Sequence, residues 1–449
     1  MTTEDRPAGV PAEATQAGEF RARWAWTEPT VWTDRMLEAL ERGVKGGHWY
    51  SLMDKVYRRE NLKAGFAEVE ANRGKPGVDH VTVEQFAQQR EEQVERLSTD
   101  LRQGTYRPAA IRRTYIPKPG SAEPRPLGIP TVRDRTVQAA LRHVLEPIFE
   151  RTFAERSYGF RPGRGAKDAL REVDRLLKNG KLYVVDADLK SYFDSIPHER
   201  LIERVKEQVA DGRVLELVKS FLKQGVMEGG RIAEAAEEGT PQGGVISPLL
   251  ANVYLNPLDH LMGQRGYAMV RYADDLVILC ASQAEADAAL AELRAWTERE
   301  GLTLHPTKTR IVDMNEAGAG FDFLGYHFTR TQRGRLTRWP RSKSLGKFKD
   351  TIRQITRRTN GHSLPQIIQR TNRSARGWFE YFKHSHHTTF GPLDSWVRQR
   401  LRSILRKRSR RRGRARGLDH QRWPNAYFAG QGLFSMIQAH ARALQSVAR

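Results

Sequence analysis

Tyr272-Ala273-Asp274-Asp275 lies between two apolar runs, residues 267–270 and 276–280. Two adjacent carboxylates at a tight turn repel each other, and the turn itself contains no basic residue to neutralise them. A divalent cation would relieve the repulsion, because hard cations such as Mg²⁺ take oxygen ligands and bridge to substrate phosphates. The alternative is an ordinary hairpin turn, in which Asp is a common residue. The rest of the chain has to decide between these two interpretations.

Two upstream segments favour the metal site. A two-metal site for phosphoryl or nucleotidyl transfer needs a further carboxylate from another part of the fold, and residues 182–194 form a β-branched and aromatic run that ends in acidic residues. Residues 239–250, between the two acidic segments, are typical of a glycine-containing loop that leads into a helix. Gly243 and Gly244 permit close approach of a ligand to the backbone, and a helix start attracts anions.

With these motifs in their order, the chain resembles reverse transcriptases of the group II intron-encoded (maturase) family. The similarity covers residues 50–445, and the matching segments are 116–119, 125–130, 157–164, 188–194, 240–244, 272–275, 308–309 and 321–326. The resemblance implies an α+β fold, a right-hand polymerase with fingers, a split βαβ palm and an α-helical thumb or maturase domain. The alternation of β-runs and helices over residues 181–313 fits such a palm.

The composition along the chain predicts five regions. They are a mobile N-terminus at 1–30, an N-terminal extension with fingers at 31–180, a palm at 181–335, a helical thumb and maturase domain at 336–417, and at 418–449 a tail that docks back on the fold. Within these regions we expect hairpins at 111–130 and 320–339 and thumb helices at 344–359, 364–383 and 392–409.

The resemblance assigns the catalytic role to three carboxylates that would hold two Mg²⁺ ions. The metal ligands it implies are Asp188, Asp274, Asp275 and the main-chain carbonyl of Leu189. Two other carboxylates in the upstream segment compete for this role. Asp186 lies two residues before Asp188 and shares its face of the strand, and Asp194 is better explained as structural.

Five further residues are candidates for nucleotide binding. The fingers residues Lys118 and Arg125 would contact the triphosphate of the incoming dNTP, since their loop is stiffened by prolines; the alternative is two solvated loop charges. The ring of Phe193 would exclude a 2′-OH, or is simply a core residue. Gln242 would donate to the nucleotide. Lys308 would protonate the leaving pyrophosphate, or is a surface lysine.

The resemblance also implies a primer grip. Its residues are Phe323, Leu324, Gly325 and Tyr326.

Positive charge is concentrated near the C-terminus. The formal net charge is +22, but residues 330–416 hold 26 Lys and Arg against 3 Asp and Glu, and the first 329 residues carry a net −3. Such a distribution is typical of nucleic-acid binding, and the interspersed aromatic residues argue against a disordered basic tail. The predicted RNA-binding residues are Arg398, Arg400, Arg402, Arg406, Lys407, Arg408, Arg410, Arg411, Arg412, Arg414 and Arg416.

Several classes of protein are excluded by composition. The single Cys280 rules out a disulfide framework and a cysteine-rich zinc site. The first 30 residues are acidic and do not resemble a signal peptide. The sequence contains no run of 18 apolar residues, so no membrane span is predicted. We therefore expect a cytoplasmic protein without a membrane partner. Without a cysteine-paired HNH endonuclease module, the chain resembles the endonuclease-lacking, class C type of the family.

These observations predict an RNA-directed DNA polymerase that binds its parent intron RNA, helps it to splice and copies RNA into cDNA for intron mobility. Its expected partners are group II intron RNA, an RNA template with a DNA primer, dNTPs and target DNA. Two alternatives stay open. One is an RNA-binding splicing factor with a silent polymerase, and the other is a domesticated relative that serves in defence or DNA repair.

Overall fold

The computed structural model describes most of the chain. The described residues are 21–44, 46–117, 124–233, 237–331, 333–413 and 415–447. For Arg125, Ser446 and Val447 the description is limited to the backbone. No helix in these stretches is both long and apolar enough to span a bilayer.

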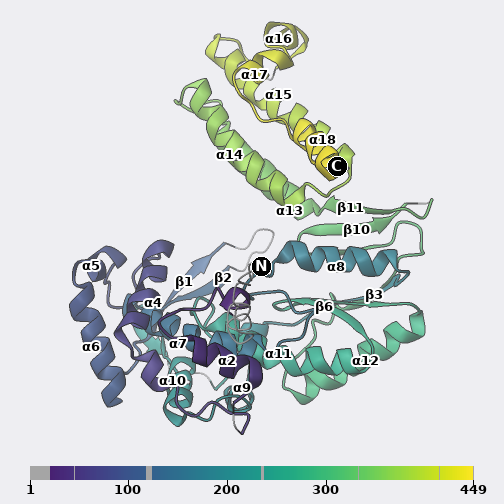
Figure 1. The fold of residues 1–449 in the computed structure, drawn as a ribbon. Helices are drawn as coiled ribbons and strands as arrows, with labels where there is room; N and C mark the ends of the chain where they lie inside the picture. Colours follow the sequence, from purple (N-terminus) through teal and green to yellow (C-terminus); the bar gives the residue numbers. More distant parts are fainter. Residues whose placement is uncertain are drawn as a thin grey trace, which may run out of the picture. The chain divides into compact units, whose positions relative to one another are not determined.

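The α+β fold class is confirmed, because the described residues form three small sheets among many helices (Figure 1). Their contacts divide the chain into two compact units. Unit 1 comprises Met1–Ala169, Ala187–Ile278 and Asp287–Thr309, and unit 2 comprises Leu170–Asp186, Leu279–Ala286 and Arg310–Arg449. This division crosses the predicted palm, so the chain passes between the units more than once.

The N-terminal part of unit 1 is helical. Its helices are α2 (Asp34–Arg42), α3 (Met53–Val56), α4 (Arg59–Asn72), α5 (Val83–Gln88), α6 (Arg90–Gln103) and α7 (Val132–Glu150). Helix α4 packs closely on α7 because a Cβ at Gly65 would lie 2.8 Å from the carbonyl oxygen of Thr136. The buried Asn61 then donates to the carbonyl of Ala140 at 3.0 Å, which satisfies its amide in the interface.

Part of the segment expected to be mobile is packed instead. Residues 1–20 lie outside the described part of the chain. Trp24, however, is 4% exposed, and its indole nitrogen donates to Glu41 at 2.6 Å. A large aromatic side chain with a satisfied polar group is a typical anchor, so the ordered chain starts earlier than residue 31.

Unit 1 also contains a four-stranded sheet with the order β2-β1-β4-β5. Its strands are β1 (Ile111–Ile116), β2 (Arg125–Ile129), β4 (Val226–Glu228) and β5 (Arg231–Ala233). Strands β1 and β2 pair antiparallel, with Ile116 opposite Arg125, and this confirms the hairpin predicted for residues 111–130. Strand β4 adds to β1 in parallel.

The second sheet carries the acidic segments. Its order is β6-β7-β3-β8, with β6 (Ala268–Tyr272), β7 (Asp275–Cys280), β3 (Tyr183–Asp188) and β8 (Arg310–Asp313). After its first residue, β7 is buried throughout, which explains its unbroken apolar run. The neighbouring helices in the sequence are α8 (Ala166–Lys178), α9 (His198–Lys206), α10 (Gly212–Leu222), α11 (Ser247–Gln264) and α12 (Gln283–Arg299). Asp188, at the end of β3, and Asp275, at the start of β7, thus belong to adjacent strands, and Asp274 lies in the turn that leads into β7.

Unit 2 holds the third sheet and the C-terminal helices. The sheet has the order β11-β10-β9 and consists of β9 (Gly320–Phe323), β10 (Tyr326–Arg330) and β11 (Leu336–Pro340). The prediction of a single, two-stranded hairpin over 320–339 is therefore wrong, because the segment forms three strands. The sequence shows only one obvious turn, whereas β9 and β10 are joined by a second, very tight one.

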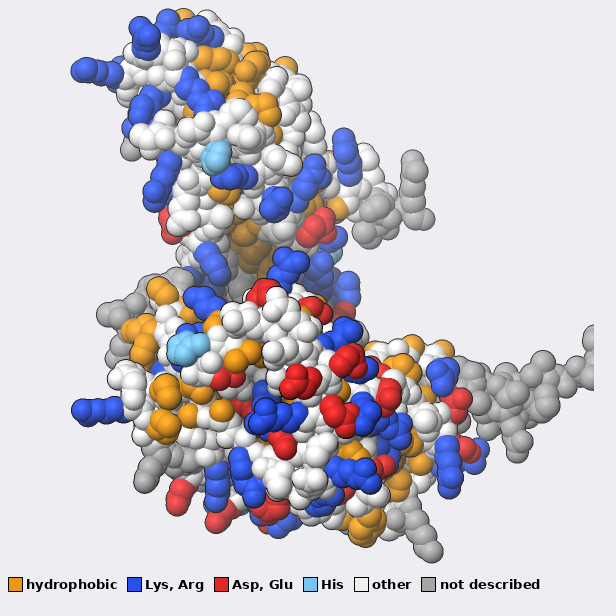
Figure 2. Space-filling view, turned by 90° about the vertical axis from the view of Figure 1, so that its left-hand side faces the viewer, with side chains coloured by type: hydrophobic (Ala, Val, Ile, Leu, Met, Phe, Trp, Pro, Cys, Tyr) orange, Lys and Arg blue, Asp and Glu red, His pale blue; other side chains and the backbone are white. Residues whose placement is uncertain are grey.

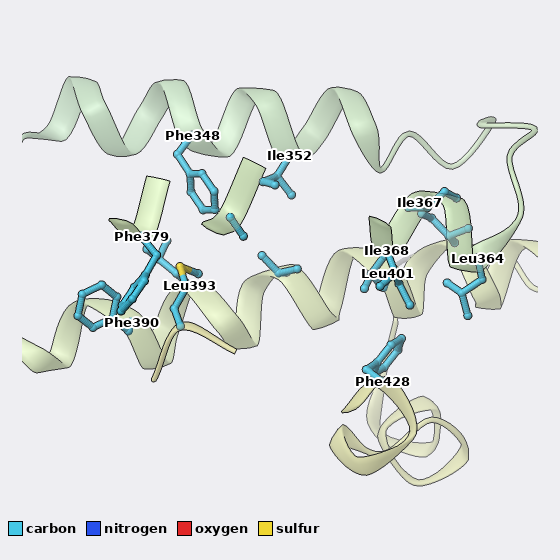
Figure 3. Close-up of a cluster of buried hydrophobic side chains, with 14 of the residues drawn as sticks. Phe348, Ile352, Leu364, Ile367, Ile368, Phe379, Phe390, Leu393, Leu401 and Phe428 are labelled. Carbon is cyan, nitrogen blue, oxygen red and sulfur yellow. The ribbon is translucent and has the colours of Figure 1, made fainter. Parts of the chain in front are cut away.

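The thumb helices begin and end within a few residues of the predicted bounds. They are α13 (Ser342–Ile355), α14 (Leu364–Phe382) and α15 (Phe390–Arg408), followed by α16 (Gly417–Arg422), α17 (Asn425–Gly430) and α18 (Met436–Val447). Helix α13 packs on α14, and α18 lies along α15 (Figure 1). Figure 3 shows their common core, in which Phe348 and Ile352 of α13, Leu401 of α15 and Phe428 of α17 are buried.

The C-terminal tail completes this core. Asp394 is 4% exposed and accepts hydrogen bonds from the backbone N–H groups of Met436 and Ile437 at 3.0 and 3.1 Å. A carboxylate at a helix start satisfies amides that have no partner within the helix. This contact fixes the start of α18 on α15, while the side chain of Ile437 itself stays 50% exposed.

Candidate functional site

The turn between β6 and β7 is short and strained. Strand β6 ends at Tyr272 and β7 begins at Asp275, so two residues make the connection. Ala273 has a φ of +57°, a left-handed conformation that is uncommon for a residue with a Cβ. Asp274 is half-buried and Asp275 is exposed. The backbone therefore directs the two carboxylates into different surroundings.

A basic partner for the turn exists, and sequence reasoning missed it. Arg271 immediately precedes the turn and is fully buried. Burial acts to lower the pKa of its guanidinium, but the carboxylates of Asp259 and, more weakly, Asp274 raise that pKa above its usual value. The side chain thus stays charged. Its position one residue before Tyr272 was visible in the sequence, but its direction, beneath the turn, was not.

Asp188 lies at the end of β3 and already has a cationic partner. Its Oδ2 lies 2.6 Å from Nζ of Lys308, and its main-chain carbonyl accepts from the N–H of His305 at 2.7 Å. Lys308, a predicted nucleotide-binding residue, thus contacts Asp188, a predicted metal ligand. Both side chains are partly exposed, so water can reach the pair.

The donor set fits Mg²⁺ in its chemistry. Carboxylates and a main-chain carbonyl are the hard oxygen ligands that this ion prefers. Among the described residues, however, no three His, Cys, Asp or Glu side chains converge closely enough to hold a metal. Because Lys308 lies on Oδ2 of Asp188, a metal ion at that oxygen would compete with the lysine. The two carboxylates that compete with Asp188 for the metal role have other contacts. Asp186 lies 3.8 Å from Arg310, and Asp194 accepts a hydrogen bond from Gln242.

The segments that carry the predicted nucleotide-binding residues Phe193 and Gln242 are joined by hydrogen bonds. Nε2 of Gln242 donates to Asp194 at 3.1 Å, and the N–H of Thr240 donates to the carbonyl of Phe193 at 2.6 Å. The ring of Phe193 is half-buried and meets the exposed ring of Phe160 edge-on, with 6.4 Å between the ring centroids. Asp194 and Gln242 also line a hollow of about 270 Å³ beside strands β1 and β2.

The two loop glycines lie against neighbouring parts of the chain. A Cβ at Gly243 would lie 2.1 Å from the carbonyl oxygen of Gly128, and one at Gly244 would lie 2.6 Å from Oγ of Ser247. The atom nearest to a Cβ at Gly244 is thus only a side-chain hydroxyl at the start of α11, whereas Gly243 lets the loop pack against the backbone of β2. The N–H of Gly128 donates to the carbonyl of Gln242 at 2.6 Å across this contact.

Two predicted fingers residues cannot be placed. Lys118 lies outside the described residues, and for Arg125 the backbone alone is described, at the start of β2.

The predicted primer grip is the tight turn between β9 and β10 in unit 2. Leu324 and Gly325 both have positive φ, +46° and +82°, as a two-residue hairpin turn of this type requires. The carbonyl of Leu324 accepts from the hydroxyl of Tyr381 at 2.8 Å. The carbonyl of Gly325 accepts from the N–H of Arg341 at 2.9 Å. Phe323 and Tyr326 are 3% and 2% exposed, so their rings pack inside unit 2.

A strongly basic hollow lies at one end of the thumb helices. It measures about 670 Å³ and is lined, apart from Thr359 and Gly413, by cations alone: Arg357, Arg358, Arg400, Lys407, Arg410, Arg411 and Arg412. Figure 2 shows Lys and Arg side chains gathered over helices α14–α18, with few Asp or Glu among them. Sequence reasoning missed Arg357 and Arg358, which follow α13 and are brought to the hollow by the fold.

Other predicted RNA-binding cations have structural partners. Arg402 is 3% exposed and donates to the carbonyl of Trp423 at 2.9 Å, so its assignment to an exposed RNA contact is wrong in this structure. Arg406 lies 2.7 Å from the buried carboxylate of Asp419. Arg400 lines the hollow but also donates to Thr356. Arg398, Arg408 and Arg416 lie outside the lining of the hollow, and Arg414 lies outside the described residues.

Two regions of the chain match known protein families. The family model described as reverse transcriptase (RNA-dependent DNA polymerase) matches residues 116–328, and the one described as group II intron, maturase-specific domain matches residues 345–423. Protein YkfC of Escherichia coli is 33% identical over 349 residues, which cover 69% of this chain and 86% of that protein.

Two longer relatives are similar over smaller parts. Group II intron-encoded protein LtrA of Lactococcus lactis is 41% identical over 174 residues, 39% of this chain and 29% of that protein. An uncharacterized 91 kDa protein in a cob intron of Schizosaccharomyces pombe is 31% identical over 261 residues, 45% of this chain and 32% of that protein. The chain thus spans less than a third of either.

Proposed function

The chain belongs to the reverse transcriptase family that carries the group II intron maturase-specific domain, and we propose that it is an RNA-directed DNA polymerase that also binds intron RNA, assists its splicing in the cytoplasm and copies RNA into cDNA at a target DNA. The observation that carries the polymerase assignment is the position of the acidic segments. They belong to adjacent strands of one sheet, inside the region that matches the reverse transcriptase family.

In this proposal Asp188, Asp274, Asp275 and the carbonyl of Leu189 hold two Mg²⁺ ions. When bound, such ions activate the 3′-OH of a primer and neutralise the triphosphate and its leaving group. The protein's own residues then supply orientation. The ring of Phe193, held against Phe160, stands as a wall that a 2′-OH would meet.

Lys308 has two positions in this mechanism. In the structure it neutralises Asp188 at 2.6 Å. When the carboxylate of Asp188 serves as a metal ligand, the flexible lysine can turn toward the triphosphate and donate a proton to pyrophosphate. Lys308→Met should therefore slow nucleotide addition and lower the Mg²⁺ concentration for half-maximal Mg²⁺-induced thermal stabilisation. An unchanged Mg²⁺ titration would show that the ion pair does not compete with the metal.

The polymerase assignment is tested by primer extension on an RNA template. Asp274→Ala should abolish cDNA synthesis. Asp186→Asn is the matched control, since Asp186 lies in the same acidic segment as Asp188 and has Arg310 as its neighbour. Wild-type synthesis by Asp274→Ala, or equal loss in both variants, would refute the assignment of the carboxylates.

For the second activity we propose that the basic hollow of the thumb binds intron RNA through its phosphates. A concave surface lined by seven cations suits a closely folded backbone, in which several phosphates converge. Splicing assistance should survive Asp274→Ala, because the hollow does not depend on that carboxylate. If splicing assistance and cDNA synthesis vanish together in a variant that folds and binds RNA, the two roles are not separable.

A splicing factor with a silent polymerase is the competing function. It predicts no cDNA synthesis by the wild-type chain under any Mg²⁺ concentration, whereas our proposal predicts synthesis that Asp274→Ala removes. A domesticated relative in defence or DNA repair would keep the polymerase and lose the preference for intron RNA. Competition between intron RNA and an unrelated structured RNA of equal length distinguishes that alternative.

A further inference from the structure

We propose that Arg271 is the positioning residue of the catalytic turn: its buried guanidinium fixes the peptide between Ala273 and Asp274 and so sets the direction of the two acidic side chains. The inference rests on the proposed polymerase function, which gives the turn its chemistry. It adds a residue that is not a metal ligand and does not touch substrate.

The contacts of Arg271 exceed what charge compensation requires. A buried ion needs a paired counter-ion, and Asp259 provides it, since it accepts from Nε at 2.8 Å and also from Nη2. The remaining donors reach further. Nη1 bonds to Oδ1 of Asn252 at 2.9 Å and to the carbonyl of Ala273 at 3.0 Å, and Nη2 bonds to Oγ of Ser157 at 2.8 Å.

The bond to Ala273 is the one that acts on the turn. Because a peptide unit is planar, holding the carbonyl of Ala273 also fixes the N–H and Cα of Asp274. Ala273 has a φ of +57°, which a residue with a Cβ adopts unfavourably, and such a conformation persists where the surroundings hold it in place. Arg271 supplies that restraint from inside the protein, on the side of the turn away from solvent.

A second segment braces the same turn. Residues 156–159 pair with Arg271 through backbone hydrogen bonds, from its N–H to Arg156 at 3.0 Å and from the N–H of Tyr158 to its carbonyl at 2.9 Å. A Cβ at Gly159 would lie 2.2 Å from the N of Ala273, so this segment packs directly against the turn. Ser157 belongs to the same segment and bonds to the guanidinium. The motif at 157–164 is therefore joined to the catalytic turn by way of Arg271.

The competing explanation is a buried ion pair that stabilises unit 1 and nothing more. The two can be separated by Arg271→Lys. A lysine keeps the charge and can still pair with Asp259, but it lacks the planar fork that reaches the carbonyl of Ala273 at the same time. A purely structural pair predicts a loss of stability alone, whereas a positioning role predicts a loss of turnover beyond it.

The experiment compares Arg271→Lys with Arg135→Lys, another buried arginine of unit 1, which donates to the carbonyls of Lys75 and Thr131. We expect Arg271→Lys to lower kcat for primer extension by about 100-fold, the effect of a small misplacement of reacting groups, with little change in the KM for dNTP. Hydrogen exchange in metal-free protein should accelerate over residues 268–280 in Arg271→Lys and stay unchanged there in Arg135→Lys.

Two results would overturn the proposal. One is a folded Arg271→Lys variant with near-wild-type kcat. The other is a loss of activity in both Arg271→Lys and Arg135→Lys that is proportional to the decrease in their melting temperatures. If Arg271→Lys does not fold, Ser157→Ala removes a single partner of the guanidinium and should give a smaller effect of the same kind. If Asp274→Ala still makes cDNA, the proposed function fails, and hydrogen exchange alone then decides whether Arg271 orders the turn.

Discussion

The basic hollow of the thumb gives the sharpest quantitative prediction, because its charges can be removed without touching the carboxylates. The perturbation is the double variant Arg357→Gln with Arg358→Gln. Both residues line the hollow, and neither belongs to the basic run at 398–416. Glutamine keeps most of the length and polarity of each side chain but abolishes its charge.

The expected magnitude follows from the number of cations. Of the seven that line the hollow, Arg400 makes three hydrogen bonds to Thr356 and Arg353 and is set aside. Arg358 makes one, to the carbonyl of Gly413 at 3.0 Å, and is counted with the other five, which gives six cations for phosphates. If each neutralises one phosphate, the slope of log K against log salt is about −4 for single-stranded and about −5 for duplex RNA. Raising salt from 50 to 200 mM should then weaken binding by roughly 300- to 2,000-fold. In the double variant, which keeps four of the six cations, the same rise in salt should weaken binding by only roughly 50- to 150-fold.

The assay is fluorescence anisotropy with labelled intron RNA at a series of KCl concentrations. The matched control is Arg96→Gln with Arg102→Gln, which removes the same charge from exposed positions on α6 of unit 1. The reasoning is refuted if the slope of the hollow variant equals that of the wild-type protein, or if the control variant lowers the slope by the same amount. The first result would show that RNA does not contact these two arginines, and the second would show that RNA responds to net charge rather than to the hollow.

Three further predictions concern single side chains. Gly159→Ala places a Cβ 2.2 Å from the N of Ala273, so overpacking should cost about 1–3 kcal/mol in urea unfolding and reduce cDNA synthesis; unchanged stability would contradict the close packing. Phe428→Ala removes a fully buried ring from the thumb core and should cost about 3–5 kcal/mol, with weaker RNA binding at 37 °C; a loss below 1 kcal/mol would show that the tail does not stabilise the core. Burial raises the pKa of the Cys280 thiol to about 12, so the neutral thiol persists up to that pH and should react with iodoacetamide at pH 8 only on unfolding.

The local features of the fold were predictable from the sequence. The alternation of apolar runs and turns located the strands that carry Asp188 and Asp275, and helical periodicity gave α13, α14 and α15 to within a few residues. These features depend on neighbours close in the chain. The sequence likewise showed that the C-terminal third is basic, since that requires only a count of charges.

What the sequence could not show are partnerships between distant residues. Lys308 and Asp188 are 120 positions apart, and Arg271 and Ser157 are 114 apart. In sequence Arg402 looks like Lys407 and Arg408, the exposed cations of the same helix, but the chain returns after that helix and Arg402 is buried against Trp423. A run of like charges therefore gave the sign of the surface correctly but could not separate the arginines that hold the thumb together from those that face RNA.

The backbone contact between Gly128 and Gln242 has a mechanical consequence. The hydrogen bond of 2.6 Å ties strand β2 to the loop before α11, and the beginning of that loop is bonded to Phe193 through Thr240 and to Ile196 through Gly239. With no side chain between the two glycine-containing segments, there is nothing soft to absorb a displacement. If the β1–β2 hairpin tilts, the residues that follow β3 are therefore expected to move with it. The hairpin and the residues that follow β3 are thus linked by main-chain hydrogen bonds, to which the bond from Gln242 to Asp194 adds one between side chains.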